Sequence, residues 1–364
     1  MSAVPEPAPS SAPSSAPSTV RRVLPKLLIS LLLAGLFVFL VQRGGVPLLP
    51  PAEAFTRVSG WGVAGYVLTL LGMHFFRASR WRFLMRPVKR DIPFWDGVLL
   101  NWIGFFAIFV LPLRLGEFAR PALTKLRHGV SLSAGLGTVA VERVIDGLVT
   151  SLCVVWALYA LPHREAQDTL TRSLPYYGNL AAGLFFCAFL GLVLFLWQRE
   201  LAVKLVYGTI GRVSPRLGDK LASKVDSVAD GVRSIAHPRL GLGFLVETLL
   251  YWGLNAGGMW VLGRACGLDM TFGHAVAVMG VLAIGILLPA GPGLFGSFQL
   301  AVSTGLKLYF AAELVGSQGA VYVFLLYGLQ AILLTLTGIL PLYAMKLSFA
   351  DILRPAPSED GPFR

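Results

Sequence analysis

Long runs of apolar residues alternate along the chain with short polar and basic stretches. Several runs approach the length of about 20 residues that a helix needs to cross the hydrocarbon layer of a bilayer. The pattern therefore predicts an all-α, polytopic integral membrane protein with about six spanning helices and two shorter, interrupted apolar segments. The expected spans cover 23–41, 60–76, 132–161, 179–197, 240–262 and 319–345, and the interrupted segments cover 94–111 and 272–288.

The two interrupted segments break in the same way. Leu-Pro stands at each break, at Pro112 and at Pro289, and Gly follows the proline after four residues and Phe after six. Broken apolar segments at corresponding places in two halves of a chain are a strong sequence indication of a transporter's binding site. We therefore expect gate or hinge residues at both breaks: Pro112, Gly116, Pro289, Gly291, Pro292, Gly293 and Gln299.

Basic residues flank the first break on both sides, at 77–90 and at 114–127. A single crossing between them would place the two clusters on opposite faces, which the positive-inside rule disfavours. A re-entrant hairpin over 94–125 that enters and leaves on the cytoplasmic side removes the conflict. A second hairpin over 272–304, entering from the other side, completes an inverted repeat with both termini in the cytoplasm. The alternative is two ordinary spans with proline kinks.

This topology also explains the charge of the chain. The 364 residues include 31 Lys and Arg and 19 Asp and Glu, so the formal net charge is +12. Under the hairpin topology 24 of the 31 basic residues are cytoplasmic. The exceptions are Arg43, Arg57, Arg164, Arg172, Arg264 and Lys307 outside, and Arg143 within a span. The positive charge therefore does not indicate nucleic-acid binding.

Composition divides the rest of the chain. Residues 1–20 are rich in Pro, Ser and Ala and should form a disordered tail, because they cannot bury a core. We expect one membrane domain over 21–346 and a short cytoplasmic tail over 347–364. Within the domain, 200–238 is a basic connector whose amphipathic helix either lies on the membrane surface or packs on the bundle. The cysteines and histidines are scattered and no phosphate-binding loop is present, so we expect no metal, no cofactor and no catalytic residue.

Three charged residues interrupt the span at 132–161: Glu142, Arg143 and Asp146. Spacings of three and four residues place them on one face of a helix. Charges inside a membrane helix are costly and usually face the bundle interior or a wet cavity. We expect Arg143 to bind an anionic headgroup while the two carboxylates orient its guanidinium. The alternative is a structural cluster of ion pairs that holds helices together.

A second charged group follows the first break, at Arg114, Glu117 and Arg120. Arginine can hold a phosphate through two parallel hydrogen bonds. Placed near Arg143, the two arginines would form a phosphate-binding cavity in which Glu117 limits the positive charge. Alternatively, they are interfacial arginines that anchor the hairpin.

The sequence Arg-Leu-Gly-Glu-Phe-Ala-Arg at 114–120, followed by Glu-Arg-Val-Ile-Asp at 142–146, resembles the transmembrane region of lysylphosphatidylglycerol synthases, the flippase-like domain family. The resemblance covers roughly 23–346 and includes the late turn rich in Pro and Gly. The chain departs from the family at Gln299, where a Glu would be expected, so an acidic role at that turn is not carried over.

The resemblance implies a translocase of the cell (inner) membrane that moves an anionic or aminoacylated phospholipid or a polyprenyl-phosphate-type lipid between leaflets. The family's two-part enzymes add a soluble transferase domain, for which we expect no room after the last span, so we expect a transporter and not an enzyme. A second copy of the chain or a lipid-synthesis enzyme would be its protein partner. The alternatives are a membrane enzyme or partner subunit in polyprenyl-linked glycan or lipid modification, and a scaffold that transports nothing.

Overall fold

The computed structural model describes residues 16–43, 45, 47–164, 169–198, 227–230, 232, 237–287, 291–348 and 351–352. All regular elements in these ranges are helical, which confirms the all-α prediction. Helix α1 (Ala16–Arg43) already includes the last residues of the predicted tail. Pro289, most of the predicted connector, the end of the C-terminal tail and the rest of the N-terminal tail lie outside the described residues.

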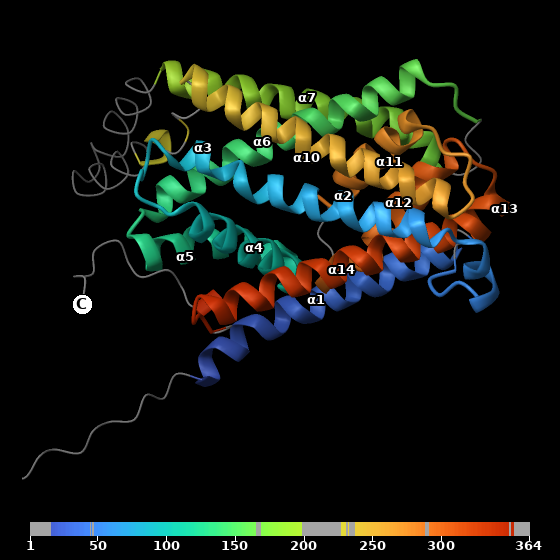
Figure 1. The fold of residues 1–364 in the computed structure, drawn as a ribbon, viewed down its shortest axis with the longest axis horizontal. Helices are drawn as coiled ribbons and strands as arrows, with labels where there is room; N and C mark the ends of the chain where they lie inside the picture. The colour runs from blue at the N-terminus through green and yellow to red at the C-terminus, as the bar shows by residue number, and fades with distance from the viewer. Residues whose placement is uncertain are drawn as a thin grey trace, which may run out of the picture.

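Six long helices occupy the segments predicted as spans and run along the long axis of the molecule (Figure 1). Besides α1, they are α2 (Gly60–Ser79), α6 (Leu132–Ala160), α7 (Thr169–Trp197), α10 (Pro238–Ala265) and α14 (Ala320–Ala344). Short helical turns lie between them at η1 (Ala52–Arg57), α3 (Trp81–Met85), α13 (Ala312–Leu314) and η5 (Val315–Gly319). By length and composition alone, two stretches of the described chain qualify to cross a membrane: Thr169–Phe195 and Ala312–Ala344.

Small residues allow α2 and α10 to pack closely and antiparallel. A methyl group added to Gly62 would lie 2.4 Å from the Cβ of Ala265, and one added to Gly258 would lie 2.4 Å from the hydroxyl of Thr69. Small residues at helix contacts are typical of membrane proteins, where close packing takes the place of the hydrophobic driving force. This pair forms one wall of the largest buried cluster, to which α11, α12 and α14 also contribute.

Each interrupted segment forms a helical hairpin. Helix α4 (Phe94–Val110) leads through the turn η2 (Pro112–Phe118) into α5 (Ala119–His128). Helix α11 (Phe272–Gly285) leads through η4 (Pro292–Leu294) into α12 (Ser297–Lys307). The two arms of each hairpin lie side by side, so the chain doubles back at both breaks. A methyl group added to Gly104 would lie 2.9 Å from the Cβ of Arg120 in the first hairpin, and one added to Gly285 would lie 2.5 Å from the Cβ of Ala301 in the second. In Figure 1 the two hairpins occupy opposite ends of the molecule.

The two hairpins pack reciprocally on the long helices. Helix α4 of the first hairpin lies on α14, which follows the second hairpin, and a methyl group on Gly338 would lie 2.1 Å from the ring of Phe106. Helix α11 of the second hairpin lies on α6, which follows the first, and a methyl group on Gly280 would lie 2.6 Å from the side chain of Val154. Each hairpin therefore rests on the long helix that follows the other one.

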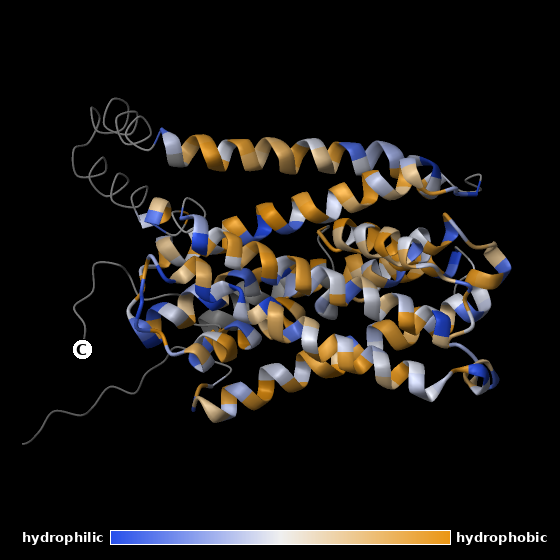
Figure 2. Cartoon of the chain, turned by 45° about the horizontal axis from the view of Figure 1, so that its top comes forward, coloured by the Kyte–Doolittle hydropathy of each residue, from blue (hydrophilic) through white to orange (hydrophobic). Residues whose placement is uncertain are grey.

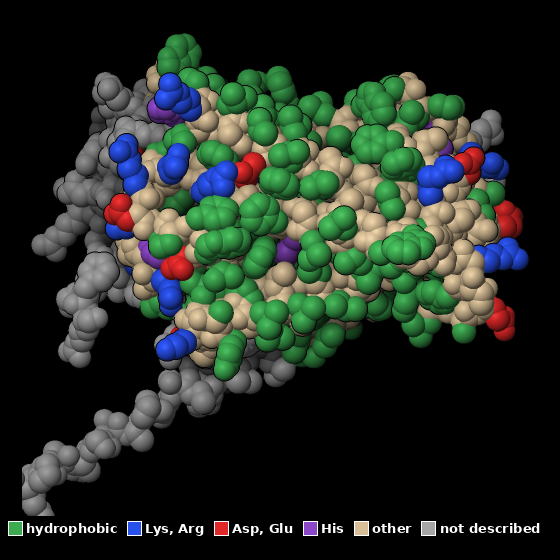
Figure 3. Space-filling model, in the orientation of Figure 1, with side chains coloured by type: hydrophobic (Ala, Val, Ile, Leu, Met, Phe, Trp, Pro, Cys, Tyr) green, Lys and Arg blue, Asp and Glu red, His purple; other side chains and the backbone are tan. Residues whose placement is uncertain are grey.

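The surface is apolar across the middle of the molecule and charged at both ends. Figure 3 shows hydrophobic side chains over the central band, with Lys, Arg, Asp and Glu gathered at the two ends, and Figure 2 shows the same division along the helices. Large apolar side chains such as Leu184, Phe186 and Leu194 on α7 are more than half exposed. Soluble monomers rarely expose a continuous apolar surface of this extent, so the distribution matches a protein that lies in lipid.

Candidate functional site

The turns of the two hairpins meet inside the molecule. Arg114 donates a hydrogen bond of 2.8 Å from Nη1 to the carbonyl oxygen of Ile286, at the end of α11. The hydroxyl of Tyr327 on α14 donates to the carbonyl oxygen of Gly293 at 3.0 Å. Leu113 and Arg114 have φ angles of 52° and 57°, a left-handed conformation that is uncommon for residues other than glycine. Strained backbone of this kind clusters at functional sites.

A partly open cavity of about 380 Å³ lies where the turns meet. Ligand pockets commonly have volumes of about 300–1,000 Å³. Most of the lining is apolar, from Phe109 on the first hairpin to Leu294 and Phe298 on the second. The charged residues that line it come from α2, the first break and α6: Arg77, Arg114, Glu117, Arg143 and Asp146.

Asp146 is held by an arginine that sequence reasoning assigned to a cytoplasmic basic cluster. Arg80, at the end of α2, donates to both carboxylate oxygens of Asp146 at 2.6 Å. Trp252 on α10 donates to the same carboxylate at 3.2 Å. The hydrogen-bonded arginine partner of Asp146 is therefore Arg80, and a role of Asp146 in orienting Arg143 stays a prediction.

Glu142 has a different arginine partner. Arg120 donates to Glu142 and also to the side-chain oxygen of Asn101 on α4. Arg120 and Glu142 are both buried, and neither lines the cavity. The pair links α5 to α6 in the interior, which agrees with the structural alternative, and a role of Glu142 in orienting Arg143 stays a prediction.

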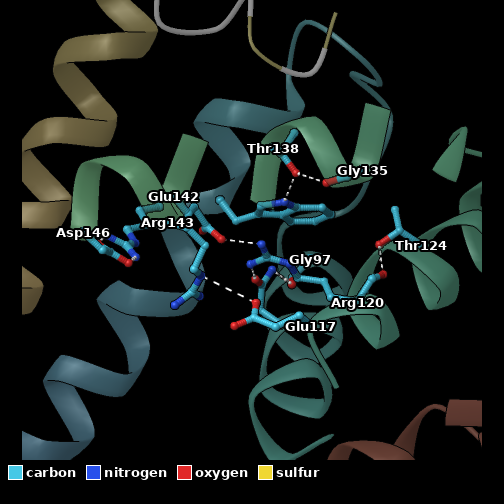
Figure 4. A network of polar contacts seen from close by, with 12 residues as sticks. Gly97, Glu117, Arg120, Thr124, Gly135, Thr138, Glu142, Arg143 and Asp146 are labelled. Carbon is cyan, nitrogen blue, oxygen red and sulfur yellow. Dashed lines mark hydrogen bonds and ion pairs between the residues drawn. The ribbon is translucent and has the colours of Figure 1, made fainter. Parts of the chain in front are cut away.

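Helix α6 presents Arg143 toward the first break (Figure 4). The hydroxyl of Ser131 caps the start of α6 by accepting a hydrogen bond from the amide of Ala134, which defines the first residue of the helix. The Nε of Arg143 lies 3.6 Å from a carboxylate oxygen of Glu117 and has no hydrogen-bond partner within the described chain. The other oxygen of Glu117 accepts from Arg114 at 2.8 Å. Three of the predicted site residues, Arg114, Glu117 and Arg143, therefore contact one another at the cavity, and a fourth, Asp146, also lines it.

Arg77 completes the cavity and was not among the predicted site residues. Its guanidinium lies over the ring of Phe105, 4.0 Å from the centroid, and its Nε has no hydrogen-bond partner among the residues described. The sequence carries a signal for it, since Arg77 and Arg80 stand one turn apart on the last turn of an apolar helix. On the sequence alone, these two arginines count only as part of the basic cluster at 77–90 that sets the membrane topology, and not as binding residues.

The charges around the cavity do not cancel. Five arginines meet three carboxylates there: Arg77, Arg80, Arg114, Arg120 and Arg143 against Glu117, Glu142 and Asp146. Two guanidinium charges remain in excess, and Arg77 and Arg143 are the two cavity-lining arginines whose buried Nε atoms lack a hydrogen-bond partner in the described part of the chain. A largely apolar cavity bordered by an excess of positive charge is suited to an anion, because electrostatic attraction is strong away from bulk water.

The expected gate residues divide into two groups. Gly293 lines the cavity, next to Gly291 and Pro292. Pro112 and Gly116 are buried, and a methyl group on Gly116 would lie 2.1 Å from the backbone of Ala107. Gln299 accepts a hydrogen bond of 2.7 Å from the amide of Gly296 and so caps the start of α12. The side-chain amide of Gln299 therefore stabilises the turn before α12.

A family model described as the lysylphosphatidylglycerol synthase TM region matches residues 26–338, most of the chain. No curated protein and no solved structure matches the chain.

Proposed function

The chain belongs to the lysylphosphatidylglycerol synthase TM region family and is a membrane protein, and on that premise we propose that it moves an anionic or aminoacylated phospholipid, or a polyprenyl-phosphate-type lipid, between the leaflets of the membrane. The headgroup binds in the cavity beside Arg114, Glu117 and Arg143. The protein acts as a transporter, with no chemical change to the lipid.

The position of the cavity carries this proposal. It lies where two broken helices meet, and its lining combines a few charged residues, in which arginines outnumber carboxylates, with many apolar ones. Arginine suits a phosphate headgroup because its planar guanidinium offers two parallel donors. The apolar lining and the partly open shape suit a ligand whose acyl or prenyl tails stay in lipid while the headgroup crosses.

The hairpins support a topology of six spans and two re-entrant hairpins with both termini in the cytoplasm. Helix α4 has 17 residues and α11 has 14, so at 1.5 Å per residue they measure about 25 Å and about 21 Å. Both are shorter than the hydrocarbon core of about 30 Å. Their reciprocal packing on α14 and α6 fits an inverted repeat, with the hairpins entering from opposite faces.

Reconstitution of the purified protein in liposomes tests the proposal. Labelled phosphatidylglycerol, lysyl-phosphatidylglycerol and a polyprenyl phosphate should each be assayed for movement between leaflets. We expect at least one of them to move. Arg143→Gln should slow that movement roughly tenfold or more, since a hydrogen bond to a charged group contributes about 1.5–3 kcal/mol.

The matched control is Arg264→Gln. Arg264 pairs with the exposed Asp269 at 3.3 Å, away from the cavity, so this variant should transport normally. If no lipid moves, translocation is wrong. If a lipid binds without moving, the chain is better explained as a partner subunit of a lipid-modifying enzyme.

A further inference from the structure

We infer that the cavity selects headgroups of net negative charge over net cationic aminoacylated ones, and that Arg77 is a substrate-binding residue that sets this preference. This inference rests on the proposed function and narrows its substrate class. The observation behind it is the pairing of every charged group around the cavity.

The carboxylates are already engaged. Glu117 accepts from Arg114 and lies 3.6 Å from Arg143, and Asp146 uses both oxygens on Arg80. Glu142 pairs with Arg120 away from the cavity. The ammonium groups of an aminoacylated lipid would need a carboxylate free to accept from them, because an unpaired cation is costly in an apolar environment. Both carboxylates of the described lining, Glu117 and Asp146, already have an arginine within 4 Å, so an ammonium group would have to compete with a guanidinium for either of them.

Two arginines, by contrast, still have bonding capacity. Arg77 and Arg143 both line the cavity, and the Nε of each has no hydrogen-bond partner within the described residues. No carboxylate of the described chain forms an ion pair with Arg77, which is held in place by the ring of Phe105. Keeping two like charges beside one apolar cavity is unfavourable until an anion binds between them. A phosphate with one or two negative charges would relieve that repulsion.

The aromatic contact also prepares Arg77 for binding. A guanidinium stacked on an aromatic ring keeps the edges of its plane available as hydrogen-bond donors. The ring of Phe105 contacts the guanidinium of Arg77, whose buried Nε has no hydrogen-bond partner among the described residues. A purely structural role as a stacked cation is the competing explanation, and selectivity between lipids separates the two.

The test compares three labelled lipids in liposomes that contain the full-length protein: phosphatidate, phosphatidylglycerol and lysyl-phosphatidylglycerol. We expect the two anionic lipids to move at least tenfold faster than the lysyl lipid. Arg77→Gln should slow the anionic lipids about tenfold and leave the lysyl lipid unchanged or faster. Arg77→Lys, which keeps the charge, should retain part of the preference. Equal rates for all three lipids in the wild type, or equal slowing of all three in Arg77→Gln, would overturn the inference.

A binding measurement keeps this inference separable from translocation. In detergent, short-chain phosphatidate should bind at least tenfold more tightly than its lysyl-phosphatidylglycerol counterpart, and Arg77→Gln should remove the difference. If the protein shows this binding preference but moves no lipid, translocation is refuted and the selectivity for anionic headgroups is retained. Inorganic phosphate provides the remaining arm. If it competes as well as the short-chain lipid does, the site binds small anions and the assignment to a lipid headgroup is wrong.

Discussion

Asp146 illustrates how charged residues are accommodated inside this bundle. Arg80 supplies a bidentate partner from α2, and Trp252 adds a third donor from α10. The spacing along α6 predicts one helix face for the three charged residues, and two of them, Arg143 and Asp146, line the cavity. It could not identify their partners, because those come from other elements, between 22 and 106 residues away in the chain. The sequence therefore predicts that these charged residues form ion pairs, but not which residues are their partners.

The Arg80–Asp146 pair leads to a prediction about stability. Asp146→Asn should destabilise the protein by about 3–5 kcal/mol, because it leaves a buried guanidinium without its counter-ion. Thermal unfolding in detergent would measure this as a lower Tm. The double variant Arg80→Met with Asp146→Leu should recover much of the loss, since an apolar pair of similar volume often replaces a buried ion pair well.

The exposed Arg264–Asp269 pair provides the control. Asp269→Asn should leave Tm unchanged, because surface ion pairs contribute little. An equal drop in Tm for Asp146→Asn and Asp269→Asn would contradict the role given to the buried pair.

At the scale of elements, the two turns depend on close backbone contact. Gly116 packs against the backbone of Ala107 at the end of α4, where a side chain has no space. We expect Gly116→Ala to displace the turn, weaken the contact between Arg114 and Ile286 and slow lipid movement. The transport assay and Tm measure both effects.

Gly328→Ala is the matched control. Gly328 lies in α14 with nothing within 4 Å of the position of an added methyl group. Alanine there should be neutral or stabilise the helix by up to about 1 kcal/mol. If Gly116→Ala changes neither Tm nor lipid movement more than Gly328→Ala does, the close contact at Gly116 is not required for function.

The orientation of the hairpins can be tested by cysteine labelling. In a background with Cys153, Cys187 and Cys266 replaced by Ala, single cysteines would be placed on each side of each hairpin. The four positions are Arg90 and Leu126 around the first, and Asp269 and Glu313 around the second; all are exposed. An impermeant reagent should reach the first two from the cytoplasmic side and the last two from the other side. Labelling of Arg90→Cys and Leu126→Cys from opposite sides would mean that the first segment crosses the membrane once.

Element positions were largely predictable from the apolar runs. The predicted segment 94–111 corresponds to α4 at Phe94–Val110, and 319–345 corresponds to α14 at Ala320–Ala344. Helix α7 differs, since it begins at Thr169, about ten residues before the apolar run. Its first turns carry polar residues, and hydropathy reports the apolar part of a helix and not its full length. Charge predicts the doubling back at the first break, because basic residues flank it on both sides, and the second hairpin was expected only from the repeated Leu-Pro pattern.

At the scale of the whole molecule, each half of the chain packs its hairpin on a long helix of the other half. The first hairpin packs on α14 and the second on α6, and the cavity forms only where their turns meet. Sequence alone predicted two related hairpins but not this exchange, since the residues in contact, such as Phe106 and Gly338, carry no mark of their pairing. The second half lines the cavity mainly with aromatic and apolar residues, which explains why the search for charged motifs found only one side of the site.

The two buried ion pairs also bear on how the protein is made. An aspartate or arginine at the centre of a helix raises the free energy of membrane insertion by about 2.5–3.5 kcal/mol. Helix α6 carries Glu142 and Asp146, whose partners Arg120 and Arg80 both precede it in the chain. Each guanidinium is therefore synthesised before the carboxylate that it neutralises. Helix α6, which carries both carboxylates, therefore follows in synthesis the two arginines that neutralise them.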